Sequence, residues 1–512
     1  MAADAPDRAE IDTQRALCEA QPSMTALWNT LARMLIAADR PAEAMAAATA
    51  ALAGAPGDAT ALNLRSAAED AHAAVELRLR TLERAAAFDP GNAALQLELG
   101  ETYADLDRPA DAQRCLQQAL RLSPGLVSAE ARLAAVYLSV DIEAGAEHHA
   151  LRALALQPGH IVASQTLAVV LERRGEGDAA RALMARAYSR QSLFAQPAAE
   201  SRMTVLVLAS IESGNIPYRH LMPAQHYSRL IWYMEHAQPG DLARAGDFDL
   251  VFNTIGDPDL AGPSAGSVRA FLAGNAKPLL NDPALVMRTH RHEIPRLLGD
   301  IPGVVAPAAA RAPAEEAGRL GLAGAAARHG LALPLLVRPV GSHGGKGLHR
   351  VQTEADWASI PALQGDVYLT CYHDYRSADG RWRKGRVIFV DGRPFPYHFA
   401  VADDWMVHYE SAGMVGAADR LAEEARFLED PAAVIGETGW AAIGEIGRRL
   451  GLHYGGVDFA PLADGRILVF EANATMLVHP EDPDGPLAYK NPAVQRIIDA
   501  FQAMLERMAQ RD

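Results

Sequence analysis

Four prolines near the start of the chain recur at a constant spacing of 34 residues: Pro56, Pro90, Pro124 and Pro158. A period of this length is typical of solenoids built from paired helices, in which each unit packs against its neighbours. With the proline at position 32, the units are 25–58, 59–92, 93–126, 127–160 and 161–194. A proline cannot continue a helix, so each one ends the second helix of its unit. The fifth unit lacks the proline, and we expect it to cap the array.

Small residues recur at positions 8, 20 and 27 of these units, where they allow two antiparallel helices to approach closely. Position 27 is always alanine, at Ala51, Ala85, Ala119, Ala153 and Ala187. Position 7 is apolar except in the second unit, where it is Arg65, and position 20 departs there too, at Arg78. With Trp28, Tyr103 and Tyr137 at family positions, residues 25–194 resemble the tetratricopeptide repeat (TPR) family.

The resemblance implies a concave groove lined by the first helix of each pair. Position 5 there holds Asn29, Asn63, Leu97, Ala131 and Gln165. Side-chain amides can pair with the backbone of an extended peptide, so one hypothesis is a groove for a peptide or protein. The alternative is a scaffold or self-association surface, and the sequence does not decide between the two.

Length and charge limit what the whole chain can be. Its 512 residues are too many for one core and suggest about three domains. The net charge of -15 argues against a nucleic-acid-binding surface. Cys18, Cys115 and Cys371 are scattered without a CxxC pair, which fits a reducing compartment. The acidic N-terminus is unlike a signal peptide, and we find no apolar run of membrane-spanning length. We therefore expect a cytoplasmic protein without a membrane or nucleic-acid partner.

Residues 201–310 alternate between strand and helix patterns. MTVLVLAS, DFDLVFN and KPLLND each read as a buried parallel strand, with a helix expected near 224–236 and a charged helix from Pro283. This order predicts a parallel sheet with ligand groups at the strand ends. His290 and His292 flank Arg291 at the start of the last helix; phosphate or surface chemistry is favoured there over a metal site.

A glycine-rich loop lies between two predicted strands in LALPLLVRPVGSHGGKGLHRV. It matches neither a Walker A loop nor a dinucleotide-binding fingerprint, because the final Ser or Thr and the following helix are missing. Backbone N–H groups and Lys346 on a hairpin loop can still close over phosphates, above a fixed charge at Arg338. The alternative is an ordinary surface turn.

Two Asp-Gly dipeptides predict tight hairpins in the last third of the chain. In WRKGRVIFVDGRPFPYHFA the turn would place Arg386 opposite Tyr397, and Pro394 and Pro396 would put the return strand at a sheet edge. Its basic residues Arg383, Lys384 and Arg386 suit an anion. In GGVDFAPLADGRILVFEANATM the turn at Asp464-Gly465 would place Asp458 opposite Glu471 and Phe459 opposite Phe470.

Strand alternation then puts Asp458, Glu471 and Asn473 on one face and the two phenylalanines on the other. Two facing carboxylates repel unless a cation lies between them, and three oxygen ligands suit Mg²⁺ shared with substrate phosphates. The simpler alternative is a half-buried hairpin whose acids point into water.

Taken in order, these segments resemble the ATP-grasp superfamily, most closely the ribosomal protein S6 modification enzyme and glutathione synthetase branch. The resemblance covers about residues 201–512. It implies ATP and Mg²⁺ as cofactors, with Asp458, Glu471 and Asn473 as metal ligands and Arg386 and Lys346 as catalytic residues. The nucleotide contacts it implies are Arg291, Arg338, Ser342, His343, Gly344, Gly345, Lys346, Thr370, Cys371 and Tyr372. Two departures stand out: Arg338 replaces the usual strand lysine, and an earlier lysine has no clear counterpart near Arg291 and His292.

The expected fold is an all-α TPR solenoid followed by an α/β pre-ATP-grasp domain and an α+β ATP-grasp domain. Residues 1–24 would lead into repeats at 25–194, followed by domains at 201–310 and 311–512. The resemblance implies a carboxylate–amine ligase that works through an acyl phosphate. Its substrates would be a small carboxylate or amine and a peptide or protein recruited by the repeats, and a homodimer is open. The alternatives are a small-molecule kinase and a repeat scaffold that binds nucleotide without turnover.

Overall fold

The structure is a computed structural model of the chain. It describes residues 14–15, 18, 24–37, 40–55, 58, 60–61, 64–65, 79–106, 108–198, 201–211, 214–223, 226–244, 246–342, 345, 347–409, 412–481 and 485–510. Pro56, Asn63, Ser66, Arg78, His343, Gly344 and Lys346, singled out above, lie outside these residues. The chain divides into two compact units: Met1–Phe194 with His236–Ala245, and Ala195–Glu235 with Gly246–Asp512.

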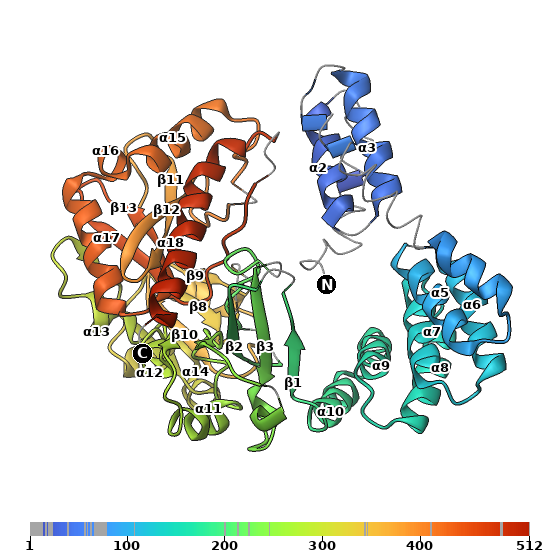
Figure 1. The fold of residues 1–512 in the computed structure, drawn as a ribbon. Helices are drawn as coiled ribbons and strands as arrows, with labels where there is room; N and C mark the ends of the chain where they lie inside the picture. The colour runs from blue at the N-terminus through green and yellow to red at the C-terminus, as the bar shows by residue number, and fades with distance from the viewer. Residues whose placement is uncertain are drawn as a thin grey trace. The chain divides into compact units, whose positions relative to one another are not determined.

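The first unit consists of helix pairs that follow the 34-residue period (Figure 1). The pairs are α2 (Thr25–Ala37) with α3 (Pro41–Gly54), α5 (Ala93–Asp105) with α6 (Pro109–Leu122), α7 (Val127–Ser139) with α8 (Glu143–Leu156), and α9 (Ile161–Arg173) with α10 (Gly177–Tyr188). In the second repeat the structure describes helix over residues 79–88. Every first helix in these pairs begins at position 1 of its unit, as the proline spacing predicts. The helical region is consistent with a TPR solenoid.

Small side chains lie where the helices of a pair meet. Ala44, Ala112 and Ala146 are fully buried. A Cβ added to Gly100 would lie 2.7 Å from the side chain of Leu116, so a larger residue there would push α5 and α6 apart. The small positions read from the sequence are therefore the helix contacts.

The amides expected at position 5 are not all exposed in the part of the chain that the structure describes. Asn29 and Ala131 are buried, and Asn29 Nδ2 donates to Asp58 Oδ1 at 3.3 Å. Gln165 is exposed on α9. A peptide on this surface would therefore meet an amide at Gln165 and other side chains elsewhere.

The last repeat is completed by a segment from later in the chain. Ser192 stands where the repeat proline is missing, and its Oγ donates to Asp241 Oδ2 at 2.6 Å. Asp241 also accepts from the backbone N–H of Gln238 at 2.8 Å. The segment His236–Ala245, including the short helix η2 (Leu242–Arg244), thus belongs with the repeats although it follows the first strands of the second unit.

The second unit begins with a sheet whose order is β1-β3-β2-β4-β5, formed by β1 (Leu193–Gln196), β2 (Met203–Ala209), β3 (Tyr227–Tyr233), β4 (Leu250–Asn253) and β5 (Leu279–Leu280). The pairs β2–β4 and β4–β5 are parallel, as predicted, and β2–β3 is parallel too. The helix expected near 224–236 is wrong: that segment is strand β3 followed by the single turn η1 (Met234–His236). Its aromatic and branched residues, Tyr227 to Tyr233, favour a strand.

The single helix expected from Pro283 is also wrong. Two short helices, α12 (Pro283–Met287) and α13 (Ile294–Leu298), follow α11 (Ala265–Leu272) and β5. Asp282 caps α12 by accepting from the N–H of Ala284 at 2.8 Å. Arg291 lies between α12 and α13, which frees its side chain to reach another element.

Two further sheets make up most of the remainder, both antiparallel except for the parallel pair β14–β6 in the second. The first has the order β7-β10-β8-β9, from β7 (Ala309–Ala312), β10 (Val367–Cys371), β8 (Leu335–Pro339) and β9 (His349–Val351). The second has the order β12-β11-β13-β14-β6, from β12 (Arg393–Ala402), β11 (Trp382–Val390), β13 (Tyr454–Pro461), β14 (Ile467–Asn473) and β6 (Val304–Val305). The glycine-rich loop joins β8 to β9, as expected. β12 is an edge strand, which accommodates its prolines.

Four helices follow β12 in the chain: α15 (Ala418–Glu429), α16 (Pro431–Ile435), α17 (Glu437–Leu450) and, at the end, α18 (Asn491–Ala509), which η4 (Ala488–Lys490) precedes (Figure 1). α14 (Ala314–Arg328) and η3 (Glu354–Ser359) pack on the first sheet. α15 packs on one face of the second sheet, where the ring of Phe427 lies 4.8 Å from that of Phe399 and 6.1 Å from that of Phe459. The other face carries Asp458, and α18 contacts it through Phe501 and Tyr454.

Both predicted hairpins form, and a bulge shifts the register of each. The two-residue turn expected at Asp464-Gly465 is wrong: the N–H of Leu462 donates to the carbonyl of Arg466 at 2.8 Å, which leaves a three-residue turn. Asp391 and Gly392 have φ values of 52° and 71°, as the tight turn requires, and the register shifts between Arg386 and Val387. Arg386 therefore opposes His398, and the expected pairing with Tyr397 is wrong. In the second hairpin Asp458 opposes Glu471 as predicted, then the register shifts between Asp458 and Phe459.

Because of that second bulge, Phe459 opposes Val469 and the predicted pairing with Phe470 is wrong. The ring of Phe470 instead lies 4.9 Å from that of Tyr375, and Lys384 Nζ lies 5.9 Å from its centroid. Bulges re-aim side chains next to functional sites in many sheets.

Residues 203–304 and 375–505, expected in two different domains, share one hydrophobic core, whereas buried residues between 312 and 369 form a core of their own. The ring of Phe501 on α18 lies 5.7 Å from Phe252 of β4 and 5.6 Å from Tyr454 of β13. The buried Asn281 donates to the carbonyl of Tyr454 at 2.8 Å and accepts from its N–H at 2.9 Å. In the part of the chain that the structure describes, no helix is long and apolar enough to cross a membrane.

Candidate active site

The polar face of the second sheet presents a row of functional side chains on neighbouring strands. Cross-strand pairing puts His398 of β12 beside Arg386 of β11, Arg386 beside Asp458 of β13, and Asp458 beside Glu471 of β14. All four side chains line a cavity of about 1340 Å³. Strand pairing thus brings together residues separated by up to 85 positions, Arg386 and Glu471.

Asp458 is fully buried and lies between two cations. Arg386 binds it with both ends of its guanidinium, Nε to Oδ1 at 2.6 Å and Nη2 to Oδ2 at 2.9 Å, and Lys384 Nζ lies 2.8 Å from Oδ2. Burial alone would raise the pKa of Asp458, but the charges of Arg386 and Lys384 outweigh burial and hold it well below its usual range. Asp458 is therefore a carboxylate at neutral pH.

Glu471 has a cationic partner from far away in the sequence. Its Oε2 accepts from Arg291 Nη2, which reaches over from the connection between α12 and α13. Burial would raise the pKa of Glu471, and the charge of Arg291 reverses this, so the pKa is lowered overall. Both acidic side chains of the predicted set are therefore charged and matched by basic ones.

Asn473 ends β14 next to the two acids and also lines the cavity. Its Oδ1 accepts from the N–H of Thr475 at 3.0 Å and from Thr475 Oγ1 at 3.2 Å. These two contacts fix the amide and occupy both lone pairs of its oxygen, so a cation bound there would replace one of them.

The donor set can be tested against Mg²⁺ from its chemistry. In the described residues no group of three or more His, Cys, Asp or Glu side chains is arranged to hold a metal. Asp458, Glu471 and Asn473 offer two carboxylates and one amide oxygen, a number suited to an ion that also binds phosphates and water. The set therefore fits Mg²⁺ held jointly with a phosphorylated ligand, and does not fit an ion held by protein alone.

Opposite walls of the same cavity come from the first antiparallel sheet. Arg338 of β8, Thr370 and Cys371 of β10, and the next residue, Tyr372, all line it. Arg338 is buried, and burial, followed by the charge of Arg291, lowers its pKa to about 10, so it stays positive at neutral pH. Its guanidinium donates to the backbone carbonyl of Ser342 and lies 3.2 Å from Ser342 Oγ.

The contacts of Arg338 with Ser342 hold the start of the glycine-rich loop. Ser342 Oγ also donates to the carbonyl of Pro339 at 2.7 Å, and Gly345 lines the cavity with a φ of 75°. Only Ser342 and Gly345 of the five loop residues predicted to bind nucleotide lie within the described residues. Ser342 contributes to a small second cavity of about 30 Å³ that also touches Arg291 and Glu471.

Aromatic side chains gather beside Tyr372. Arg350 lies over the rings of Tyr372 and Trp405, 5.1 and 4.6 Å from their centroids, and those two rings are 5.9 Å apart. Trp405 belongs to the connection between β12 and α15, which begins at Asp403. This connection also supplies Met406, Val407, His408 and Tyr409 to the cavity. A flat aromatic ligand has stacking surfaces at this end.

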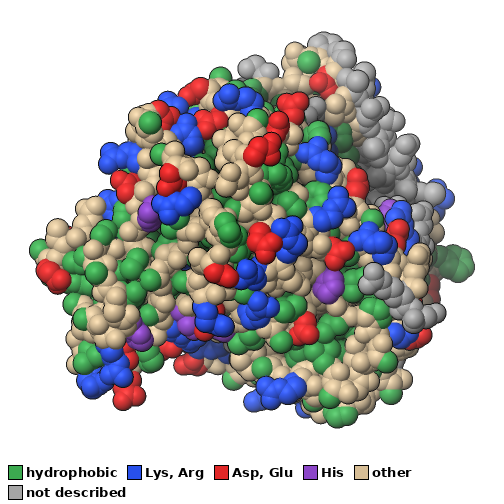
Figure 2. Space-filling model, turned by 90° about the vertical axis from the view of Figure 1, so that its left-hand side faces the viewer, with side chains coloured by type: hydrophobic (Ala, Val, Ile, Leu, Met, Phe, Trp, Pro, Cys, Tyr) green, Lys and Arg blue, Asp and Glu red, His purple; other side chains and the backbone are tan. Residues whose placement is uncertain are grey.

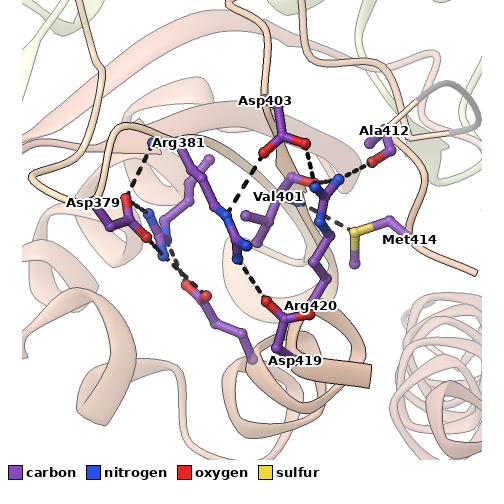
Figure 3. A network of polar contacts seen from close by, with 10 residues as sticks. Asp379, Arg381, Val401, Asp403, Ala412, Met414, Asp419 and Arg420 are labelled. Atoms are coloured by element: carbon purple, nitrogen blue, oxygen red, sulfur yellow. Dashed lines mark hydrogen bonds and ion pairs between the residues drawn. The ribbon is translucent and has the colours of Figure 1, made fainter. Parts of the chain in front are cut away.

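A network of polar contacts holds that connection (Figure 3). Arg420 donates to the carbonyls of Val401 at 3.1 Å and Ala412 at 2.5 Å, and to Asp403 Oδ2 at 2.5 Å. Arg381 pairs with Asp419 at 2.6 Å from the more exposed side. Arg420 therefore links both ends of the segment that covers the cavity.

The predicted basic strand divides between two faces. Lys384 and Arg386 face the cavity, whereas Arg383 pairs with Asp379 at 2.8 Å and Glu423 at 2.5 Å on the other side. The hypothesis that all three bind an anion is therefore wrong for Arg383, because side chains alternate along a strand.

Beyond β12 lies a cluster that the sequence did not reveal. Lys490 is buried, pairs with Glu481 at 2.6 Å, and lies over the rings of Tyr409 and Tyr397 at 4.3 and 5.5 Å. Glu424, also buried, accepts from the backbone N–H of Phe399 at 2.8 Å and from the hydroxyls of Tyr409 and Tyr489 at 2.7 and 2.5 Å. No spacing pattern signals these contacts, since they join elements far apart in the chain.

The surface of the second unit mixes both charges. Figure 2 shows Lys and Arg side chains interspersed with Asp and Glu on the face turned to the viewer. The concentrated basic residues are those inside the cavity: Arg291, Arg338, Lys384 and Arg386.

Comparisons with known proteins give low scores. No family model matches the chain, and no curated protein matches it. Among solved structures the chain is similar to MamA, at 18% identity and a TM-score of 0.20 over 36% of this chain and 86% of that one. It is similar to YrrB, described as a TPR protein with an unusual peptide-binding site, at 18% identity and a TM-score of 0.22 over 35% and 93% of the two chains.

A third similarity falls on a ligase. The VanG D-Ala:D-Ser ligase from Enterococcus faecalis matches at 13% identity and a TM-score of 0.34, over 58% of this chain and 99% of that chain. Likenesses at this level establish no family for the chain.

Proposed function

We propose that this protein is an ATP-dependent carboxylate–amine ligase that forms an amide through an acyl phosphate. The observation that carries the proposal is the row Arg386–Asp458–Glu471 on the floor of the cavity, facing Arg338 and the glycine-rich loop. Transfer of a phosphoryl group needs positioned cations and a metal-binding acid pair rather than a nucleophilic side chain. The residues present supply both.

ATP would lie between the two antiparallel sheets. Thr370, Cys371 and Tyr372 would border the adenine, with Trp405 and Tyr372 offering stacking faces. Arg338 and the backbone of the glycine-rich loop, with Lys346, would hold the phosphates. Arg338 keeps the positive charge at a position where the resemblance implies lysine, and its planar fork suits two phosphate oxygens.

Mg²⁺ would be held by Asp458, Glu471 and Asn473, where it neutralises charge on the transferred phosphoryl group. In the structure Arg291, Lys384 and Arg386 already pair with the two acids. Those three side chains would turn toward phosphate oxygens when the acids bind a cation. Arg386 would then lie beside the acyl phosphate and stabilise its developing charge.

In the first step, a carboxylate oxygen of the substrate attacks the γ-phosphorus of ATP and ADP leaves. In the second, an amine attacks the carbonyl carbon, the C–O bond to phosphate breaks, and inorganic phosphate departs with the electron pair. The repeats would recruit a peptide or protein that supplies one of the two groups.

The test is ADP release from Mg-ATP in the presence of pooled amino acids, small amines and peptides, with Glu471→Gln as the control. Glu471→Gln removes a charge and keeps the shape, and we expect at least a roughly 100-fold lower rate, since it weakens the metal site. ADP release that needs both a carboxylate and an amine supports the ligase. Release with a single substrate and a stable phosphorylated product would identify a kinase instead. Binding of ATP without turnover in any pool would contradict enzymatic function.

A further inference from the structure

One side chain of the cavity lacks a hydrogen-bond partner where its neighbours have theirs. His398 is 7% exposed, and its Nδ1 is buried without a partner in the described part of the chain. Among the described residues that line the cavity, it is the only one with such an atom. Buried polar atoms are nearly always paired, so an exception beside a cavity indicates a partner that arrives with the ligand.

Two neighbours of His398 already have partners of their own, because Tyr409 donates to Glu424 and Lys490 pairs with Glu481. The hydroxyl of Tyr397 accepts from the N–H of His479 at 3.4 Å, and no hydrogen bond joins it to Nδ1 of His398. The rings of Tyr409 and Tyr397 lie 4.9 and 5.5 Å from the imidazole and hold its orientation. The imidazole is thus fixed in place with one function unused.

The charges around His398 keep it neutral. Burial, followed by the positive charge of Arg386 beside it on β11, lowers its pKa well below the usual value. Lys490 and Lys384 act in the same direction, and Asp458 of β13 opposes them. A neutral imidazole accepts a hydrogen bond through one ring nitrogen, whereas the three nearby cations disfavour a positively charged ligand group.

The place of His398 in the row of side chains on this face of the sheet indicates which part of the substrate it contacts. His398 follows Arg386 on the side away from Asp458 and Glu471, across β11. If the acyl phosphate lies at Arg386 with its phosphate toward the two acids, His398 borders the carbonyl carbon from the side opposite to the leaving phosphate. An amine attacks a carbonyl carbon over one face of the carbonyl plane, and an amine held on the His398 side of the acyl group would lie beside the imidazole.

We propose that His398 binds the amine substrate and accepts the proton that this amine loses on attack, an inference that rests on the proposed ligase function. The uncharged amine donates an N–H to the imidazole while its lone pair forms the C–N bond. The nitrogen becomes positively charged, and its proton passes to the imidazole. The C–O bond to phosphate then breaks, phosphate leaves with the electron pair, and the imidazole returns its proton to the phosphate or to water.

This assignment requires only a weak base. A nitrogen bonded to the tetrahedral carbon is a far stronger acid than a free ammonium ion, so a histidine with a lowered pKa can take its proton. It also specifies the form of the acceptor: a primary or secondary amine that enters uncharged, because the nearby cations disfavour an ammonium group.

The experiment separates the two half-reactions in the full-length protein. Mg-ATP and pooled amino acids and dipeptides are supplied with and without hydroxylamine, which is largely uncharged at neutral pH and traps an acyl phosphate as a hydroxamate. Wild type, His398→Gln, His398→Ala and the matched control His329→Gln are compared. His329 lies at the end of α14, where it pairs with Glu316 outside the cavity.

We expect His398→Gln to form hydroxamate at close to the wild-type rate and to lose amide formation by about 100-fold, the usual size of a lost proton acceptor. Glutamine still accepts a hydrogen bond but takes up no proton, so its KM for the amine should stay near wild type while kcat falls. His398→Ala should raise KM as well. His329→Gln should change neither reaction.

Other results would overturn the inference. Equal loss of hydroxamate and amide would mean that His398 supports phosphoryl transfer or folding, which thermal unfolding of His398→Gln would tell apart. Unchanged amide formation in both His398 variants would remove it from the reaction. If the wild type gave neither hydroxamate nor ADP, the ligase proposal itself would fail and this inference with it.

Discussion

At the level of single side chains, the site is defined by buried acids held between cations. Asp458 is fully buried beside Arg386 and Lys384, and Glu471 is matched by Arg291. A buried carboxylate that loses its partner is costly, because the charge is then left without compensation in a poorly polarisable surrounding. Stability and catalysis therefore depend on the same contacts here.

Arg386→Ala is expected to lower the free energy of unfolding by about 2 kcal/mol, less than for a wholly broken pair because Lys384 still contacts Asp458. Chemical denaturation of the full chain measures it. The double variant Arg386→Met with Asp458→Asn should recover part of this loss, since no charge is then left unpaired at that point. A single variant as stable as wild type would show that the ion pair contributes nothing to folding.

The residues of the site could be predicted from the sequence more easily than the side chains that pair with them. Asp458, Glu471 and Asn473 follow from one turn and the alternation of strands. Arg291 and Glu471 are 180 positions apart, and no local pattern joins them. His398 was missed for another reason: the bulge after Arg386 moves the register by one residue and replaces the expected Tyr397. Bulges depend on packing across the sheet, which a single strand sequence does not report.

Among helices, strands and connections, the segment between β12 and α15 matters most for ligand entry. It supplies Trp405, Met406, Val407, His408 and Tyr409 to the cavity. A Cβ added to Gly345 of the glycine-rich loop would lie 3.5 Å from Met406 Sδ, so the two segments approach each other over the phosphate site. Arg420 holds this covering segment at both ends.

Arg420→Ala should loosen the covering segment, because the carbonyls of Val401 and Ala412 lose their donor. We expect faster hydrogen exchange across it and a KM for ATP raised roughly fivefold, equivalent to about 1 kcal/mol of lost binding. Hydrogen exchange with mass spectrometry and steady-state kinetics measure the two effects.

Arg381→Ala is the matched control for that change. Its pair with Asp419 is more exposed, and surface pairs contribute little. Equal effects of the two substitutions on exchange and on KM would show that the covering segment does not depend on Arg420.

The regular elements were predictable where one strong local rule decides them. The proline period gave the helix starts at 93, 127 and 161, and the Asp391-Gly392 turn gave a hairpin. β3 was missed because Tyr227, Leu230 and Ile231 also have the i, i+3, i+4 spacing of a short amphipathic helix. Its pairing on both sides with other strands decides for a strand, and that information lies elsewhere in the chain.

Over the full length of the chain, the main question is what the repeats add to the cavity. Position 5 of the repeats does not present an exposed side chain in every unit, since Asn29 and Ala131 are buried. Recruitment of a large substrate is still the role we propose, because a small-molecule ligase needs no solenoid.

A chain that starts at Ser192, and so keeps the contact of its hydroxyl with Asp241, tests this role. We expect it to release ADP with free amino acids at close to the full-length rate and to lose at least about tenfold in kcat/KM on peptides, since tethering by a second site raises effective concentration. Steady-state ADP release on both substrate classes measures the difference. Equal kcat/KM on peptides with and without the repeats would contradict a recruiting role.

The segment His236–Ala245 has a mechanical consequence. The backbone passes from one compact unit to the other after Phe194, returns at His236 and leaves again at Gly246. Three backbone connections join the two units, so the units are not independent domains on a single linker. A protease that cuts near residue 200 breaks one of these connections. The repeats would still be held by the segment His236–Ala245, which stays covalently attached to the second unit at both of its ends. The nicked halves should migrate together in gel filtration, and grafting a foreign solenoid would require replacing two separate stretches of the gene.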